Sequence, residues 1–122
     1  MRKLQLLSLA VALALPLLAF QCQEPPTPAA ARPTGGLQAR IAELQAKPKG
    51  NPAYTIWSYS WQGQKVYLAS EQTCCDQYLT LYDECFRALC APSGGFSGKG
   101  DGRCPQFYQD ATDQQLVWRD PR

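Results

Sequence analysis

Cysteine is the residue type whose number and spacing point most directly to chemistry in this chain of 122 residues. The six cysteines are Cys22, Cys74, Cys75, Cys85, Cys90 and Cys104. So many cysteines in a short chain are typical of an exported protein that is stapled by disulfides in an oxidising compartment. The spacing lacks the paired Cys-x-x-Cys of a zinc ribbon and the single Cys-x-x-Cys of a thiol oxidoreductase. We therefore expect structural disulfides and no metal.

The sequence leaves the pairing of these cysteines open. A bridge between the adjacent Cys74 and Cys75 would close a strained ring, so each is expected to pair with one of Cys85, Cys90 and Cys104. Many pairings of these five cysteines are compatible with the sequence, and one of the five must stay free or bond to another chain. We do not expect Cys22 to fold back from the N-terminal segment and complete the set.

The N-terminal residues have the layout of a signal peptide over residues 1–21. Arg2 and Lys3 precede an apolar run from Leu9 to Phe20, which is shorter than the roughly 20 residues of a membrane-spanning helix. Cys22 follows at the position where a bacterial lipoprotein carries its lipid, although the residues just before it are not the usual small ones. We expect lipidation at Cys22 and attachment to a cell-envelope membrane. The alternatives are ordinary cleavage and a permanent anchor helix.

Residues 22–36 are rich in Pro and Ala and contain no aromatic side chain. Such a segment cannot bury enough apolar surface to offset its ordering entropy. We expect a flexible spacer that holds a domain off the membrane, or a leader remnant without a role. A single Cys-rich domain over residues 37–122 follows.

The first elements of that domain are a helix and a hairpin. Apolar residues at helical spacing predict an amphipathic helix over 37–46, which Pro48 ends. Alternation then predicts a hairpin over 55–69 with Gln62-Gly63 as its turn. In this register Tyr59 lies opposite Val66, Trp57 opposite Leu68, and Ser60 opposite Lys65. One face is then aromatic and aliphatic, which is typical of core, and the other is mostly polar.

A second hairpin is predicted over 77–90. With Asp83-Glu84 as the turn, Leu81 lies opposite Phe86 and Leu79 opposite Ala88. A Gly-rich loop is expected over 91–105, then a short helix that starts at Pro105 and a closing strand with Leu116 and Trp118. The sequence thus predicts an α+β fold: a small disulfide-stapled domain with two β-hairpins, a closing strand, an N-terminal helix and one short helix.

The Gly-rich loop is the candidate binding element, because Cys90 and Cys104 would pin its ends and pre-organise it. Its candidate contact residues are Ser93, Phe96, Lys99, Asp101 and Arg103. The loop is not a phosphate loop, since Gly100 stands where Ser or Thr is needed after the lysine, and one acidic residue does not make a calcium loop. A binding protein should expose an apolar or aromatic patch on or beside this loop, whereas a purely structural protein need not.

Several classes of function are disfavoured. The chain has no His, which excludes Ser-His and Cys-His catalysis, and apart from Arg2 and Lys3 its charges balance, which disfavours nucleic-acid binding. Paired carboxylates could catalyse hydrolysis, and the candidates are Asp76, Asp83, Glu84 and Asp101. Carboxylates at turns are more often structural, so we expect no enzyme and no cofactor. The expected function is an exported binding or interaction module for a protein or glycan at the cell surface, using the loop or the polar face of the first hairpin. The alternatives are a structural envelope protein or a small carboxylate-based hydrolase.

A combination of short motifs over residues 38–122 resembles a family of short exported proteins from Bacteroidota. The motifs are Trp57 with Tyr59, Gly63-x-x-Val66-Tyr67, Cys74-Cys75-Asp76-Gln77, Leu81-Tyr82-Asp83, Cys90-Ala91-Pro92, Gly94-Gly95 and Gly98-x-Gly100-Asp101-Gly102-x-Cys104-Pro105. Members of that family are often lipoprotein-like and have no assigned activity. Ser93 stands where the resemblance leads us to expect Asp, so no role built on a second acidic residue in the loop carries over.

Overall fold

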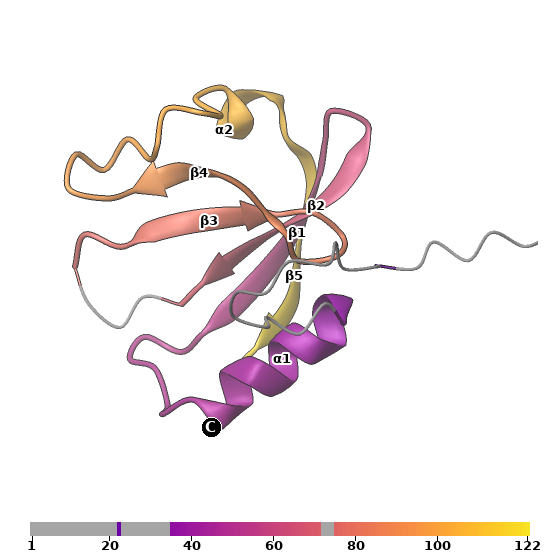
Figure 1. Ribbon diagram of the computed structural model, residues 1–122, viewed down its shortest axis with the longest axis vertical. Coiled ribbons are helices and arrows are strands. Elements are labelled where there is room, and N and C mark those ends of the chain that lie inside the picture. Colours follow the sequence, from indigo (N-terminus) through magenta and orange to yellow (C-terminus); the bar gives the residue numbers. More distant parts are fainter. Residues whose placement is uncertain (1–21, 23–34, 72–74) are drawn as a thin grey trace, which may run out of the picture.

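The computed structural model describes residues 22, 35–71 and 75–122. The expected signal peptide, most of the expected spacer and Cys74 lie outside these residues. The elements are α1 (Gly36–Ala46), β1 (Thr55–Trp61), β2 (Gln64–Ser70), β3 (Tyr78–Tyr82), β4 (Ala88–Gly94), α2 (Phe107–Asp110) and β5 (Thr112–Arg119). Figure 1 shows them as a small α+β domain, the predicted fold class. Neither α1 nor α2 is long and apolar enough to cross a membrane.

The strands form one antiparallel sheet in the order β4-β3-β2-β1-β5. The predicted register of the first hairpin is confirmed, with Tyr59 opposite Val66 and Trp57 opposite Leu68. Its turn residues Gln62 and Gly63 both have positive φ, at 51° and 74°. This is the backbone of a two-residue turn whose twist matches that of the flanking strands.

Side chains pack on both faces of the sheet, although β5 is largely exposed. On one face Phe107 of α2 packs edge-on against Tyr59 and Trp61, with ring centroids 5.1 and 5.6 Å apart. The prediction that this aromatic face is core is therefore confirmed. The opposite face of the hairpin packs under α1, and Ile56 and Ser58 are buried there. Ser58 of the predicted polar face is thus buried, whereas Ser60 and Lys65 at its far end are exposed, so binding through this face stays a prediction.

The second hairpin has a longer connection than predicted. Leu81 lies opposite Cys90 and Leu79 opposite Ser93, instead of Phe86 and Ala88. The cause is Asp83, whose carboxylate accepts hydrogen bonds from the backbone N–H groups of Cys85 and Arg87 at 2.9 Å and so stabilises a connection over 83–87.

The longer connection also determines where its aromatic residue lies. Phe86 has a φ of 54° and leaves the strand. Its ring stacks on Tyr67 and Tyr82, with centroids 4.9 and 5.5 Å apart, on the face that carries α1. The ring therefore joins the core between helix and sheet instead of pairing across the hairpin.

The last strand departs from simple alternation. A register shift places Leu116 opposite Trp57 but Trp118 opposite Ile56, so the two side chains belong to different faces of the sheet. At the opposite edge of the sheet, strand β4 extends to Gly94, so the Gly-rich loop begins later than predicted.

Two disulfides join four of the five described cysteines. One joins Cys22 to Cys85 and the other joins Cys90 to Cys104. The expectation that Cys22 stays out of the bridges is therefore wrong. The three expected partners of the Cys74-Cys75 pair are all engaged elsewhere, so that pairing prediction is wrong as well.

The C-terminal residues attach the end of the chain to α1, beside which Figure 1 places the C-terminus. Arg122 donates hydrogen bonds to the carbonyl oxygens of Leu44, Gln45 and Lys47 at 3.0–3.3 Å. Hydrogen bonds from Arg122 hold the pKa of the Asp120 carboxyl below its ordinary value. These contacts provide hydrogen-bond donors to carbonyl oxygens at the C-terminal end of α1, where intrahelical donors run out.

Candidate functional site: the loop after β4

The segment between β4 and α2 is fixed at both ends by the Cys90–Cys104 disulfide. The two Cα atoms lie 6.1 Å apart, and both side chains are buried in the core cluster that contains Phe107. The predicted disulfide-pinned loop is therefore present. Its ends cannot separate without disturbing the core.

Backbone hydrogen bonds hold the interior of the loop. Four of them, 2.9–3.3 Å long, run from Gly94 N to Gly98 O, Gly98 N to Gly95 O, Gly100 N to Gly94 O, and Asp101 N to Ala91 O. The loop thus folds back along the outer edge of β4. These bonds restrain the backbone where the loop leaves β4 and where it returns to it.

Glycine is required where the loop meets the sheet. Gly94 and Gly100 have φ values of 83° and 74°, a region that L side chains rarely adopt. A Cβ on Gly100 would lie 1.9 Å from the carbonyl oxygen of Ala91, and one on Gly94 would lie 2.2 Å from that of Gln77. Gly94 and Gly100 are therefore required by close packing of the loop against the sheet.

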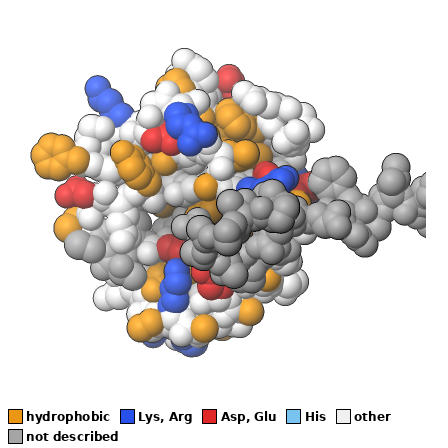
Figure 2. All heavy atoms as spheres, viewed as in Figure 1, with side chains coloured by type: hydrophobic (Ala, Val, Ile, Leu, Met, Phe, Trp, Pro, Cys, Tyr) orange, Lys and Arg blue, Asp and Glu red, His pale blue; other side chains and the backbone are white. Residues whose placement is uncertain are grey.

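Phe96 occupies the tip of this defined loop and is 96% exposed. Two half-exposed aromatic residues, Tyr78 and Tyr108, lie beside the loop. The Tyr78 ring lies against Gly95, and the Tyr108 hydroxyl hydrogen-bonds the Ser93 hydroxyl at 2.8 Å. Figure 2 shows hydrophobic side chains projecting into solvent at the end of the molecule where Figure 1 draws the loop.

The charged loop residues are exposed around this tip. The Asp101 carboxylate accepts the backbone N–H of Arg103 at 3.0 Å and so serves as a turn-forming group. The Arg103 guanidinium lies 3.9 Å from the same carboxylate, and its side chain is 69% exposed. Lys99 is exposed and pairs through its backbone with Gly94.

Four of the five predicted contact residues thus share one loop: Phe96, Lys99, Asp101 and Arg103. Ser93 belongs to strand β4, where its hydroxyl orients Tyr108. Sequence reasoning missed Tyr78 and Tyr108 as neighbours of the loop. The signal for Tyr78 was its pairing with Gly94 across β3 and β4, which the incorrect hairpin register concealed.

Of the four predicted hydrolytic carboxylates, Asp76 and Asp101 do not line the cavity that contains the other two. Asp83 and Glu84 line a cavity of about 440 Å³ between the two hairpin turns, but they are neighbours on one turn. Asp83 is engaged by two backbone N–H groups and by Arg87 Nε at 2.8 Å. This carboxylate acts as a structural acceptor and is not placed as a general acid or base.

Within residues 22, 35–71 and 75–122, no group of three or more His, Cys, Asp or Glu side chains could hold a metal ion. The expectation that the protein needs no metal remains a prediction.

The other disulfide lies at the opposite end of the β3–β4 hairpin. Cys85 is in the connection between the strands, whereas the candidate loop follows β4. Figure 1 shows the short indigo segment at Cys22 on the right and the loop on the left. The sulfur of Cys22 is used by the bond to Cys85, and a lipid thioether would need that same sulfur, so the two states exclude each other.

Fold and site define a small disulfide-stapled α+β domain that exposes a pinned aromatic loop. Residues 42–120 match the model of a domain of unknown function, DUF6970. The chain belongs to this family. Curated proteins contain no match to the chain, and solved structures contain none.

Proposed function

We propose that this protein is an exported interaction module whose loop after β4 binds a partner protein, with Phe96 as the anchoring side chain. The observation that carries the proposal is a phenylalanine 96% exposed at the tip of a loop fixed by a disulfide and four backbone hydrogen bonds. Burying a phenylalanine side chain contributes about 1.5–3 kcal/mol, and leaving it in water forgoes that gain.

The rigidity of the loop supports a binding role. Ordering a loop upon binding costs free energy, so a loop that is already ordered contributes more of its contact energy to affinity. A central aromatic side chain surrounded by polar residues is also typical of a binding hot spot. Lys99, Asp101 and Arg103 supply such a polar surround.

The position of the N-terminal attachment favours presentation of this surface. The Cys22–Cys85 bond lies at the end of the β3–β4 hairpin that is opposite to the loop. An N-terminal membrane anchor would therefore hold the domain with the loop facing away from the membrane. Export to an oxidising compartment accounts for both disulfides. We favour the disulfide over the predicted lipid anchor at Cys22, since the buried Cys85 would otherwise lose its partner. The intact mass of the mature protein separates a bridge from a lipid.

Differential cross-linking tests the proposal. The purified protein is added to cells of its source organism and is then cross-linked to their surface. Three forms are compared: wild type, Phe96→Ser and Val117→Ser. Val117 is the matched control, because it is an apolar side chain 37% exposed on β5. We expect one partner to be captured by wild type and Val117→Ser and to be lost with Phe96→Ser.

Equal capture by all three forms would refute the role of Phe96 and would favour the alternative of a purely structural envelope protein. Both variants change exposed side chains. Equal thermal melting therefore serves as the control for folding.

A further inference from the structure

A surface cavity of about 300 Å³ lies where α2 passes into β5, on the face of the sheet that carries Phe107. Its size is at the lower end of the range for small-molecule sites. None of its described lining residues is Lys or Arg. The lining consists of two tyrosines and the four residues that follow α2: Tyr59, Tyr108, Ala111, Thr112, Asp113 and Gln114.

The backbone of β5 is irregular at this cavity. A β-bulge places two residues, Asp113 and Gln114, opposite the single residue Tyr59 of β1. Asp113 has a φ of 54°, in the left-handed region that Asp tolerates better than most residues. Bulges re-aim side chains and are common beside active sites. This bulge brings a carboxylate and an amide to the cavity that Tyr59 lines.

The hydroxyl of Tyr59 lacks a hydrogen-bond partner in the part of the chain that the structure describes. Tyr59 is nevertheless only 9% exposed. Burial and the neighbouring Tyr108 raise the pKa of the Tyr59 hydroxyl above its ordinary value. The influence of Tyr108 places this hydroxyl at the cavity that both tyrosines line. A nearly buried polar group without a partner costs free energy, and a ligand that hydrogen-bonds it removes that cost.

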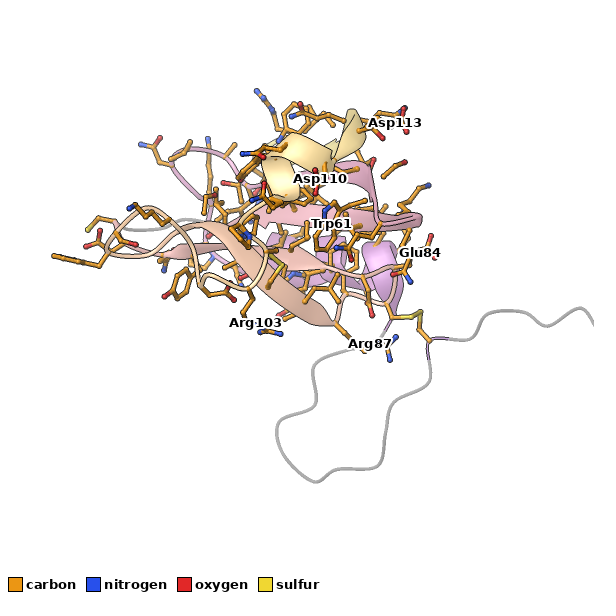
Figure 3. All side chains as sticks on the ribbon, turned by 90° about the horizontal axis from the view of Figure 1, so that it is seen from above. Trp61, Glu84, Arg87, Arg103, Asp110 and Asp113 are labelled. Atoms are coloured by element: carbon orange, nitrogen blue, oxygen red, sulfur yellow. A yellow bond between two sulfur atoms is a disulfide. The ribbon has the colours of Figure 1, made fainter. Side chains whose placement is uncertain are left out.

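The neighbouring polar groups are held in position. The hydroxyl of Tyr108 is hydrogen-bonded to that of Ser93 at 2.8 Å. The Asp113 carboxylate accepts a hydrogen bond from the Thr112 hydroxyl at 3.3 Å, the only one it receives from the described residues, so lone pairs remain for a ligand. Figure 3 shows Asp113 at the periphery of the domain beside α2, which carries Asp110.

These groups match an uncharged ligand that is rich in hydroxyl groups. One sugar hydroxyl can donate to the Asp113 carboxylate while another accepts from the Tyr59 hydroxyl. An anion would be repelled by Asp113 and would meet no Lys or Arg in the described lining. An ammonium ion has no lone pair for the Tyr59 O–H group.

We propose that this cavity binds one residue of a neutral sugar. The proposal goes beyond the proposed function and does not depend on it, because neither Phe96 nor any other residue of its loop lines the cavity.

The test is an NMR titration that follows the backbone amide signals of Asp113 and Gln114. The probes are the methyl β-glycosides of glucose, galactose and N-acetylglucosamine, with acetate and ethylammonium as charged controls. We expect at least one glycoside to shift both signals and neither ion to do so. The amides of α1, which lies on the opposite face of the sheet, are internal references. Unmoved signals with all three glycosides, or an equal response to either ion, would overturn the proposal.

Variants determine whether the expected groups make the contact. Asp113→Asn tolerates the positive φ but removes the charge, and it should weaken binding about tenfold. Asp110→Asn is the matched control and should bind like wild type, because Asp110 does not line the cavity. An Asp113→Asn variant that binds like wild type would overturn the proposal.

Tyr59→Phe separates a binding role from a structural one. The variant keeps the ring that packs on Phe107 and loses only the unpartnered hydroxyl. We therefore expect weaker sugar binding without a lower melting temperature. Unchanged binding in this variant would overturn the role of the hydroxyl and with it the proposed site.

Discussion

Removal of the Cys90–Cys104 disulfide is the perturbation whose effect follows most directly from the structure. The bond joins cysteines 14 positions apart, and both are buried in the core. Cross-linking a loop of about 15 residues lowers the entropy of the unfolded chain and stabilises the fold by about 3 kcal/mol. We therefore expect the Cys90→Ala/Cys104→Ala double variant to lose about 3 kcal/mol of its free energy of unfolding. Alanine is preferred to serine because it buries no hydroxyl group.

Guanidinium denaturation followed by tryptophan fluorescence measures this loss. With a slope of about 3 kcal/mol per molar denaturant, the midpoint should fall by about 1 M. The amide of Gly98, whose hydrogen bond to Gly95 closes the tip of the loop, should also exchange faster with solvent. An unchanged midpoint together with an unchanged exchange rate would refute the claim that this bond holds the loop.

Three further predictions concern the core, the loop glycines and the C-terminus. Phe107→Ala should cost about 3–5 kcal/mol in a denaturant melt, because Phe107 is fully buried against the aromatic face of the sheet. Gly100→Ala should lower the melting temperature more than Gly98→Ala, since both have positive φ but only the former meets the backbone of β4; equal shifts would contradict the packing argument. Asp120 has a lowered pKa because Arg122 hydrogen-bonds its carboxylate, so its contribution to stability is full above the ordinary value of about 3.9 and is lost as the pH falls through the lowered one. Asp120→Asn should therefore show a smaller loss of stability between neutral and acidic pH in urea melts, and an unchanged loss would refute this role.

The sequence predicts those parts of the fold in which local chemistry and packing agree. In the first hairpin, alternation and the Gln62-Gly63 turn specify the same register, and that register is observed. The second hairpin has no glycine at its turn, and the Asp83 side chain stabilises a longer connection. No periodicity in β3 or β4 carries that information, because it depends on one carboxylate and two backbone N–H groups.

Disulfide pairing depends on contacts that sequence spacing does not encode. Cys22 and Cys85 are 63 positions apart, and only the folded domain brings them together. The candidate loop was predictable from its glycines and from the cysteines at its ends. Its aromatic neighbours were not predictable in the same way. Tyr78 lies beside the loop because of the pairing of β3 with β4, and Tyr108 lies there because it hydrogen-bonds the hydroxyl of Ser93.

The most direct test of the central claim is the affinity of the captured partner for three forms of the protein. These are wild type, Phe96→Ser, and the double variant that lacks the Cys90–Cys104 bond. The account predicts a loss of about 2 kcal/mol, roughly 30-fold in Kd, for Phe96→Ser. It also predicts a weaker complex for the double variant, because a loosened loop must be ordered on binding. Equal dissociation constants for all three forms would contradict the claim that a pinned Phe96 makes the contact.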